Sequence, residues 1–148
     1  NVIAHKITDL QISAICSPEF SQQHQIKQLC DINNLPLIDL TYMDDIWHRW
    51  SNTLDFELLT SKRAITFSDY DSAIRAASQG LGMALAMFPI ERVQLERGVI
   101  VAPFGEFIPF PHSLYAVYRQ EDENRHDIKC FIDWLSKSPT LKNTPIDE

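Results

Sequence analysis

The segment 67–86 (FSDYDSAIRAASQGLGMALA) constrains the fold more than any other part of this chain. It is typical of the end of a strand, a capped helix, a glycine stop and a second strand. Ser68, with Asp71 three residues later, resembles a capping box that satisfies the first N–H groups of a helix. Gly80 suits the left-handed position just past the helix. The segment therefore predicts a helix N-terminus that points beyond the carboxyl end of a strand.

The hydrophobic spacing within this segment predicts which faces are covered. Ala73, Ile74 and Ala77 make one side of the helix apolar and small enough to lie close on a sheet. Residues 83–88 are apolar without alternation, as expected for a strand that is buried on both faces. The helix and the strand are thus expected to be neighbouring layers of one core.

Strand and helix signals alternate along the rest of the chain. This order predicts an α/β fold with a mainly parallel sheet and helices on both faces. Ligands of such sheets bind beyond the carboxyl ends of the strands. Two helices, after Cys16 and after Phe67, are expected to begin there, with N-termini suited to a carboxylate or a phosphate. Strands are expected at 2–7, 10–16, 35–42, 58–67, 99–104 and 113–119, and helices at 18–30, 45–54, 89–97 and 124–137, with a loop at 105–111 and a polar interruption at 60–63.

Composition narrows the class of protein. The net charge of −7, without a basic stripe, argues against direct binding of nucleic acid by this segment. No apolar run approaches the ~18 residues of a membrane span and no secretory signal is visible, so a cytoplasmic location is expected. Cys16, Cys30 and Cys130 show no CxxC spacing and are expected to be buried, reduced thiols. The first residue is Asn rather than Met, which suggests a piece of a longer chain.

A search for reactive groups finds no catalytic pattern. The 5 histidines lack HExxH or another metal-ligand spacing. Residues 80–82 (GLG) lack the third glycine of a dinucleotide fingerprint, and neither a GxSxG elbow nor a Walker loop occurs. The sequence therefore predicts no metal, no cofactor and no catalytic residue. A small α/β enzyme with an unrecognised site is the alternative.

A few aromatic and polar residues are candidates for contact with a ligand. Trp47 and Trp50 share one helix face, which suits either packing in the core or the apolar wall of a ligand cleft. Capping explains Asp71, whereas a tyrosine in the first helical turn is not needed for capping. Tyr70 or the neighbouring Asp69 is therefore a candidate to touch a ligand.

Seven short pieces of the chain form a series whose order and spacing cover most of its length. The pieces are 16–19 (CSPE), 47–50 (WHRW), 67–77 (FSDYDSAIRAA), 80–85 (GLGMAL), 95–104 (LERGVIVAPF), 115–118 (YAVY) and 131–135 (FIDWL). Taken together, they resemble the effector-binding region of a LysR-type transcriptional regulator. The tryptophan pair resembles the branch that includes glycine-cleavage and β-lactamase regulators.

The resemblance implies two α/β sub-domains like those of type II periplasmic binding proteins, with a small-molecule effector between them. It also implies a DNA-binding helix-turn-helix domain absent from this chain, and assembly into homo-oligomers. In this arrangement the chain comprises a hinge strand (about 1–12), the second sub-domain (about 13–112), a return strand with a C-terminal helix (about 113–138) and a tail (139–148).

Carried over by position, the effector-facing candidates are Ser17 at one helix start and Ser68, Asp69 and Tyr70 at the other. Tyr115, on the returning strand, is a further candidate. The helix N-termini favour an anionic effector. A solute-binding protein of the same fold is the alternative to a transcriptional regulator.

Overall fold

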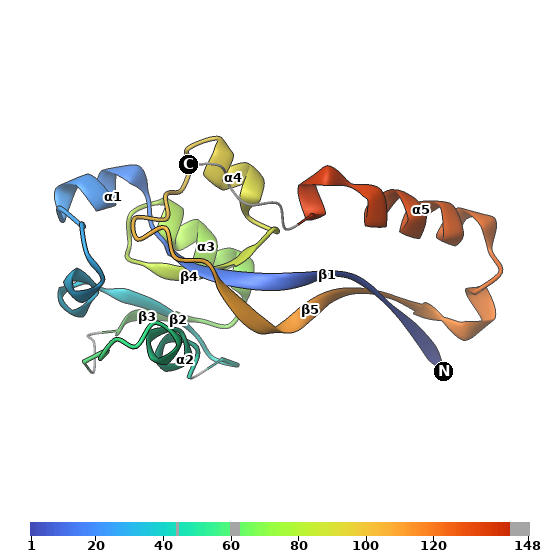
Figure 1. Ribbon diagram of the computed structural model, residues 1–148, viewed down its shortest axis with the longest axis horizontal. Helices are drawn as coiled ribbons and strands as arrows, with labels where there is room; N and C mark the ends of the chain where they lie inside the picture. Colours follow the sequence, from blue (N-terminus) through green and yellow to red (C-terminus); the bar gives the residue numbers. More distant parts are fainter. Residues whose placement is uncertain (44, 60–62, 143–148) are drawn as a thin grey trace.

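The computed structural model describes residues 1–43, 45–59 and 63–142 (Figure 1). One sheet has the strand order β4–β1–β5, and a second sheet pairs β2 with β3. The strands are β1 (Val2–Ile15), β2 (Leu37–Leu40), β3 (Arg63–Phe67), β4 (Ala84–Phe88) and β5 (Ile108–Arg119). The helices are α1 (Pro18–Gln23), α2 (Ile46–Thr53), α3 (Tyr70–Ser78), α4 (Arg92–Glu96) and α5 (His126–Lys137), with 3-10 turns at Leu29–Asn34, Gln120–Asp122 and Pro139–Leu141.

The strand directions differ from the mainly parallel sheet that was predicted. β1 pairs antiparallel with both β4 and β5, whereas β2 and β3 are parallel. A parallel bridge between Leu37 and Met83 joins the two sheets. There the Ile38 N–H donates to the Met83 carbonyl (2.7 Å), and the Met83 N–H donates to the Pro36 carbonyl (3.0 Å). β2, β3 and β4 therefore point one way, and β1 runs against them.

β1 is one continuous strand rather than the two expected at 2–7 and 10–16. Its pairing with β5 shifts register between Lys6 and Thr8 and again between Asp9 and Gln11. Such irregularities interrupt the alternation of side chains, so the apolar pattern breaks although the strand continues. β5 likewise begins within the predicted loop at 105–111. It is an edge strand, a place where proline is tolerated.

Around residues 12–16 and β4 both faces of the sheet are covered, as predicted for residues 83–88. On one face Ile12, Ala14 and Cys16 of β1 and its continuation join a buried cluster with the tryptophans of α2. On the other face Ile15 joins a cluster built on the small residues of α3. The buried residues of α3 are Ala73, Ile74, Ala76 and Ala77.

Several element boundaries are corrected. α1 begins as predicted, with Ser17 Oγ accepting from the Phe20 N–H (3.1 Å), but it ends at Gln23 instead of continuing to Cys30. The N-cap of α3 is Asp69 rather than Ser68, because Asp69 Oδ1 accepts from the Ser72 N–H (2.8 Å). α4 covers only Arg92–Glu96 of the helix expected at 89–97, and the strand expected at 99–104 is reduced to a bridge between Cys16 and Val101.

One further prediction, for Gly80, is confirmed, and two others fall on residues outside the described ranges. Gly80 does adopt the left-handed conformation past α3, with φ 82°. Residues 60–62 of the polar interruption and residues 143–148 of the tail lie outside the described residues. No helix in the described ranges is long and apolar enough to cross a membrane.

The cysteines differ from the prediction. Cys16 is buried, and burial raises the pKa of its thiol to about 12. Cys30 and Cys130 are exposed instead of buried. Cys30 lies in a short surface 3-10 turn and Cys130 on α5, a helix without buried residues. Cysteine is frequently buried in proteins, but that tendency does not place an individual residue.

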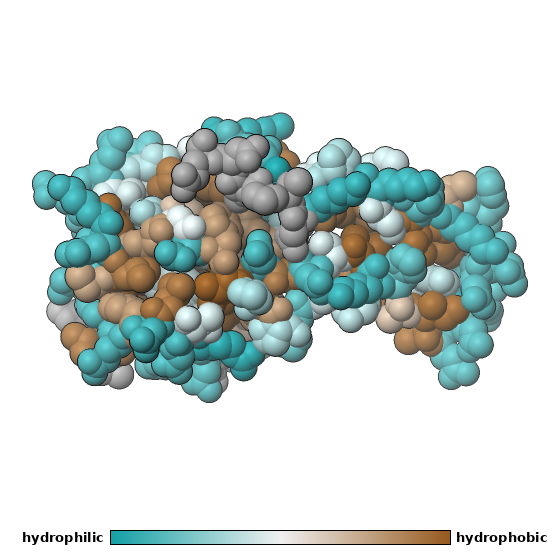
Figure 2. Space-filling model, in the orientation of Figure 1, coloured by the Kyte–Doolittle hydropathy of each residue, from teal (hydrophilic) through white to brown (hydrophobic). Residues whose placement is uncertain are grey.

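The molecule has two regions that differ in burial. The arm comprises residues 1–9, residues 113–125 and α5; the other described residues form the body. Figure 1 shows α5 beside the far part of the β1–β5 ribbon, away from α1, α2 and α3. In the arm Val117, Phe131 and Trp134 are 61%, 56% and 63% exposed. Figure 2 shows hydrophobic patches along this end of the molecule.

Candidate functional site

Three parallel strands bring their carboxyl ends to one edge of the body. The Thr41 N–H, just past β2, donates to the Phe67 carbonyl at the end of β3 (2.9 Å). β4 ends beside them at Phe88, which pairs with Gln11 of β1. Gln11 also pairs with Pro109, so the start of β5 reaches the same place. We call this place the carboxyl edge; ligands of α/β sheets bind beyond such edges.

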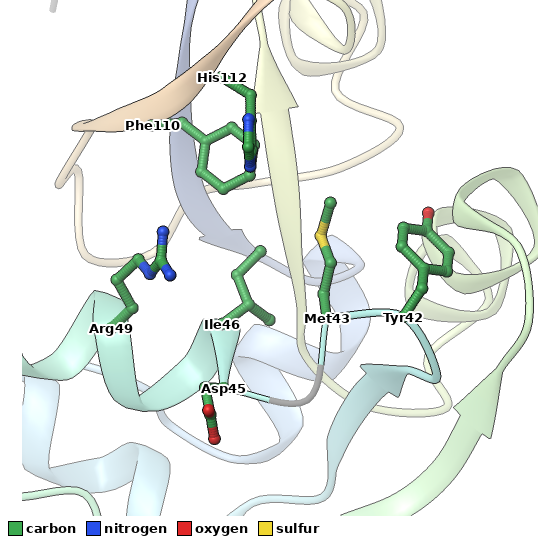
Figure 3. A pocket seen from close by; sticks show the side chains of 7 residues that line it. All are labelled: Tyr42, Met43, Asp45, Ile46, Arg49, Phe110 and His112. Atoms are coloured by element: carbon green, nitrogen blue, oxygen red, sulfur yellow. The ribbon is translucent and has the colours of Figure 1, made fainter.

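A cavity of about 420 Å³ opens at the carboxyl edge (Figure 3). Its volume lies within the range of small-molecule sites. The lining comes from the segment after β2, from α2 and from the first part of β5. The lining residues are Tyr42, Met43, Asp45, Ile46, Arg49, Phe110 and His112.

The cavity combines a cation with apolar and aromatic surface. In Figure 3 the side chains of Arg49 and Ile46 extend toward Phe110 and His112, whereas the Asp45 carboxylate points away. The rings of Phe110 and His112 meet edge to face, with centroids 5.1 Å apart and an interplanar angle of 70°. Among the described residues, no carboxylate lies within ion-pair distance of the Arg49 guanidinium. Arg49 is therefore available to an anion.

The N-terminus of α3 also lies at the carboxyl edge, but it is already occupied by a carboxylate. Asp69 caps the helix, and the hydrogen bond from the Ser72 N–H holds the pKa of Asp69 below its usual range. Ser68 and Asp69 are both exposed there. Because the Asp69 carboxylate offsets the positive end of the helix dipole, the N-terminus of α3 attracts an external anion less strongly than predicted from the sequence.

Tyr70 connects α3 to the neighbouring strand. Its hydroxyl accepts a hydrogen bond from the Met87 N–H (2.7 Å). Burial raises the pKa of Tyr70 and raises the pKa of Glu91, which is 8% exposed. The hydroxyl of Tyr70 thus has a structural partner in β4, whichever ligand the edge binds.

Ser17 lies at the opposite edge from α3's N-terminus. β1 runs antiparallel to β4, so its end meets the start of β4. A Cβ placed on Gly80, at the far end of α3, would be 3.4 Å from Ser17 Oγ. The prediction that the helices after Cys16 and Phe67 begin at one edge is therefore wrong, and Ser17 does not join Ser68 in one site.

Trp47 and Trp50 are 2% and 0% exposed and fill the core under α2. Their rings are 5.7 Å apart in an edge-to-face arrangement, and Trp47 Nε1 donates to the Ile38 carbonyl (2.9 Å). This burial supports the packing alternative over the cleft-wall alternative. By filling the inner face of α2, the two tryptophans direct Arg49 outward.

Tyr115 lies further along β5, where it pairs with Lys6 and is 50% exposed. It stands three positions beyond His112, about 10 Å at the rise of a β-strand. It therefore lies in the arm, outside the cavity lining.

Sequence reasoning missed the residues that line the cavity. One signal was present for Arg49, because Trp47 and Trp50 define the inner face of α2 and leave Arg49 on the outer one. For Phe110 and His112 the prolines of 105–111 were read as a loop, which concealed the start of a strand.

Comparison with known proteins identifies the family. The family described as "LysR substrate binding domain" matches residues 1–139, and this chain belongs to it. The HTH-type transcriptional regulator DsdC of Escherichia coli is 30% identical over 138 residues, which cover 88% of this chain and 44% of that protein. The glycine cleavage system transcriptional activator homolog of Haemophilus influenzae is 25% identical over 138 residues, 93% of this chain and 46% of that protein. The chain thus spans less than half the length of these relatives.

Solved structures agree. The AmpR effector binding domain of Citrobacter freundii matches with a TM-score of 0.75 and 26% identity, over 91% of this chain and 66% of that one. The CrgA regulatory domain of Neisseria meningitidis matches in fold, with a TM-score of 0.67, 16% identity and coverage of 95% and 69%. The LysR resemblance and the fold class like that of type II periplasmic binding proteins are confirmed.

Proposed function

We propose that this chain is the ligand-sensing part of a LysR-type transcriptional regulator, in which a small-molecule effector bound at the carboxyl edge alters DNA binding by a helix-turn-helix domain outside the chain. The match of the LysR substrate-binding family over residues 1–139 carries the proposal. The cavity at the carboxyl edge supports it, because its position is the one that α/β sheets use for ligands. The relatives of this chain are transcriptional regulators, so we assign the chain no enzymatic activity.

We propose an anionic effector on the basis of the cavity rather than of the helix N-termini. Ser17 and Asp69 each cap their own helix. Arg49 and His112, in contrast, present side-chain nitrogens to the cavity. Ser68, Asp69 and Tyr115 lie outside the cavity lining and stay secondary candidates for contact with the effector.

The regions of the chain correspond to parts of a two-sub-domain protein. Residues of about 1–12 form the hinge strand, about 13–112 the second sub-domain, and about 113–138 the return strand and final helix. The uncovered apolar residues of the arm fit this assignment, because a first sub-domain would pack against them. The intact protein is cytoplasmic and acts as a homo-oligomer, with no membrane association.

The effector acts by population shift, since it favours the arrangement of the two sub-domains that it binds more tightly. A gel-shift titration with the intact protein and the DNA upstream of its own gene tests this function. Specific binding that changes with a metabolite is expected. No specific binding with any metabolite tried would contradict the proposal. Arg49→Gln should retain DNA binding and lose the response to the metabolite.

A further inference from the structure

The geometry points to the chemical class of the effector: a monocarboxylate carried on a flat, apolar body, with Arg49 binding the carboxylate and the Phe110–His112 ring pair contacting the body. This inference rests on the proposed function and assigns a ligand to the same cavity.

Arg49 is the carboxylate anchor. Its guanidinium presents a planar fork of N–H donors that matches both oxygens of a carboxylate. It projects from the outer face of α2 toward the two rings, as Figure 3 shows. The Asp45 carboxylate, one turn earlier on the same helix, points away and does not compete for it. An anion that enters the cavity therefore meets Arg49 first.

The charge balance favours a ligand with a single negative charge. Among the residues that the structure describes, the lining contains one arginine, Arg49, and one acid, Asp45. The whole chain carries a net charge of −7, which repels an anion more strongly the more charge it carries. A carboxylate with one charge is therefore preferred over a phosphate, which carries nearly two.

The remaining walls select a flat apolar body. The rings of Phe110 and His112, at 70° to each other, form a corner in which a planar group can face one ring and meet the other by its edge. Met43 and Ile46 form the opposite wall. The flexible thioether of Met43 adapts to a planar surface. An aryl carboxylate satisfies the cation and both walls at once.

Isothermal titration calorimetry of the intact protein tests the inference with four probes. Benzoate carries both features, cyclohexanecarboxylate lacks the flat ring, benzamide lacks the charge, and inorganic phosphate lacks the apolar body. Benzoate is expected to bind at least several-fold more tightly than cyclohexanecarboxylate, and at least tenfold more tightly than benzamide or phosphate.

Two pairs of variants assign the contacts. Arg49→Gln should weaken benzoate binding at least tenfold, whereas Arg97→Gln, which removes an equal charge from an exposed position outside the cavity, should leave it unchanged. Phe110→Leu should remove the preference for benzoate over cyclohexanecarboxylate. The control Phe131→Leu, which changes an exposed phenylalanine on α5, should preserve that preference.

The inference is overturned if no probe binds, if phosphate binds as tightly as benzoate, or if Arg49→Gln and Arg97→Gln weaken binding equally. The proposed function is judged separately by the gel shift. A neutral metabolite that changes DNA binding, or one whose effect survives Arg49→Gln, would keep the function and overturn the assigned ligand class. Absence of specific DNA binding would overturn the function whatever the calorimetry shows.

Discussion

Two helices of this molecule are equally amphipathic in sequence and differ completely in burial. α3 buries Ala73, Ile74, Ala76 and Ala77 against the sheets of the body. α5 has apolar residues at helical spacing, Ile128, Phe131, Ile132 and Leu135, yet none of its residues is buried. An amphipathic pattern therefore predicts a helix and its apolar face, but burial depends on whether the rest of the chain supplies a surface to cover that face.

The largest expected effect comes from tryptophan truncation in the two regions. Trp50→Ala should lower the free energy of unfolding by about 3–5 kcal/mol, because a large core side chain is lost. Trp134→Ala should change it by less than about 0.5 kcal/mol, since Trp134 is 63% exposed. Urea denaturation followed by circular dichroism measures both. Equal losses would break the distinction between a covered body and an uncovered arm.

The next effect tests how the body's two sheets are joined. A Cβ on Gly82 would lie 2.6 Å from the Pro36 carbonyl oxygen, which accepts the Met83 N–H in the bridge between β2 and the start of β4. Gly82→Ala should therefore cost about 1–3 kcal/mol of unfolding free energy by overpacking. Gly98→Ala is the control, because nothing lies within 4 Å of its Cβ and only its φ of 69° opposes alanine. A smaller loss for Gly82→Ala than for Gly98→Ala would show that β4 is free to move away from β2.

The cap of α3 should have a moderate effect. Asp69→Ala should lower the melting temperature by roughly 2–8 °C through the loss of one N-cap. Ser68→Ala should leave the melting temperature within about 1 °C, because Ser68 does not cap the helix. Differential scanning calorimetry of both variants decides which residue is the cap. A larger decrease in melting temperature for Ser68→Ala than for Asp69→Ala would identify Ser68 as the cap, as predicted from the sequence.

Glu91 should give the body a small dependence on pH. Burial raises the pKa of its carboxyl in the folded state above the usual 4.5, so folding favours the protonated form. The stabilisation is then complete below pH 4.5 and is lost as the pH rises through the folded-state pKa. Glu91→Gln, which resembles the protonated acid, should match the parent protein at pH 4 and exceed its melting temperature at pH 7. Glu106→Gln, an exposed control, should show no such divergence; equal behaviour of the two variants would refute the role of burial.

The parts of the fold that sequence predicts are those that depend on neighbours along the chain. The start of α1 at Pro18, the span of α2 and the left-handed Gly80 each follow from a few adjacent residues. The cap of α3 was misplaced by one residue, because Ser68 and Asp69 are both good caps and only backbone geometry separates them. The direction of β1 was missed because pairing partners far apart in sequence decide it.

The candidate site shows the same division. Ser68 and Asp69 were placed at a strand end correctly, whereas Ser17 was assigned to the same edge because a parallel sheet was assumed. The cavity residues Arg49 and His112 come from elements distant in sequence and meet only through the tertiary fold. A convergent site without a sequence motif is therefore hidden until the strand order is known.

The continuity of β1 has a mechanical consequence. The strand pairs with β4 at its end and with β5 over most of its length. Within β1, the body and the arm are therefore connected by a continuous paired strand and not by a flexible linker. Any rotation of one region against the other must twist a hydrogen-bonded ribbon. The register shifts beside Thr8 and Asp9 are the places where the ribbon yields most easily. Faster hydrogen exchange at residues 7–10 than at residues 12–15 would identify residues 7–10 as the flexible point of the ribbon. A movement at the carboxyl edge would then change the orientation of α5 through twisting at this point.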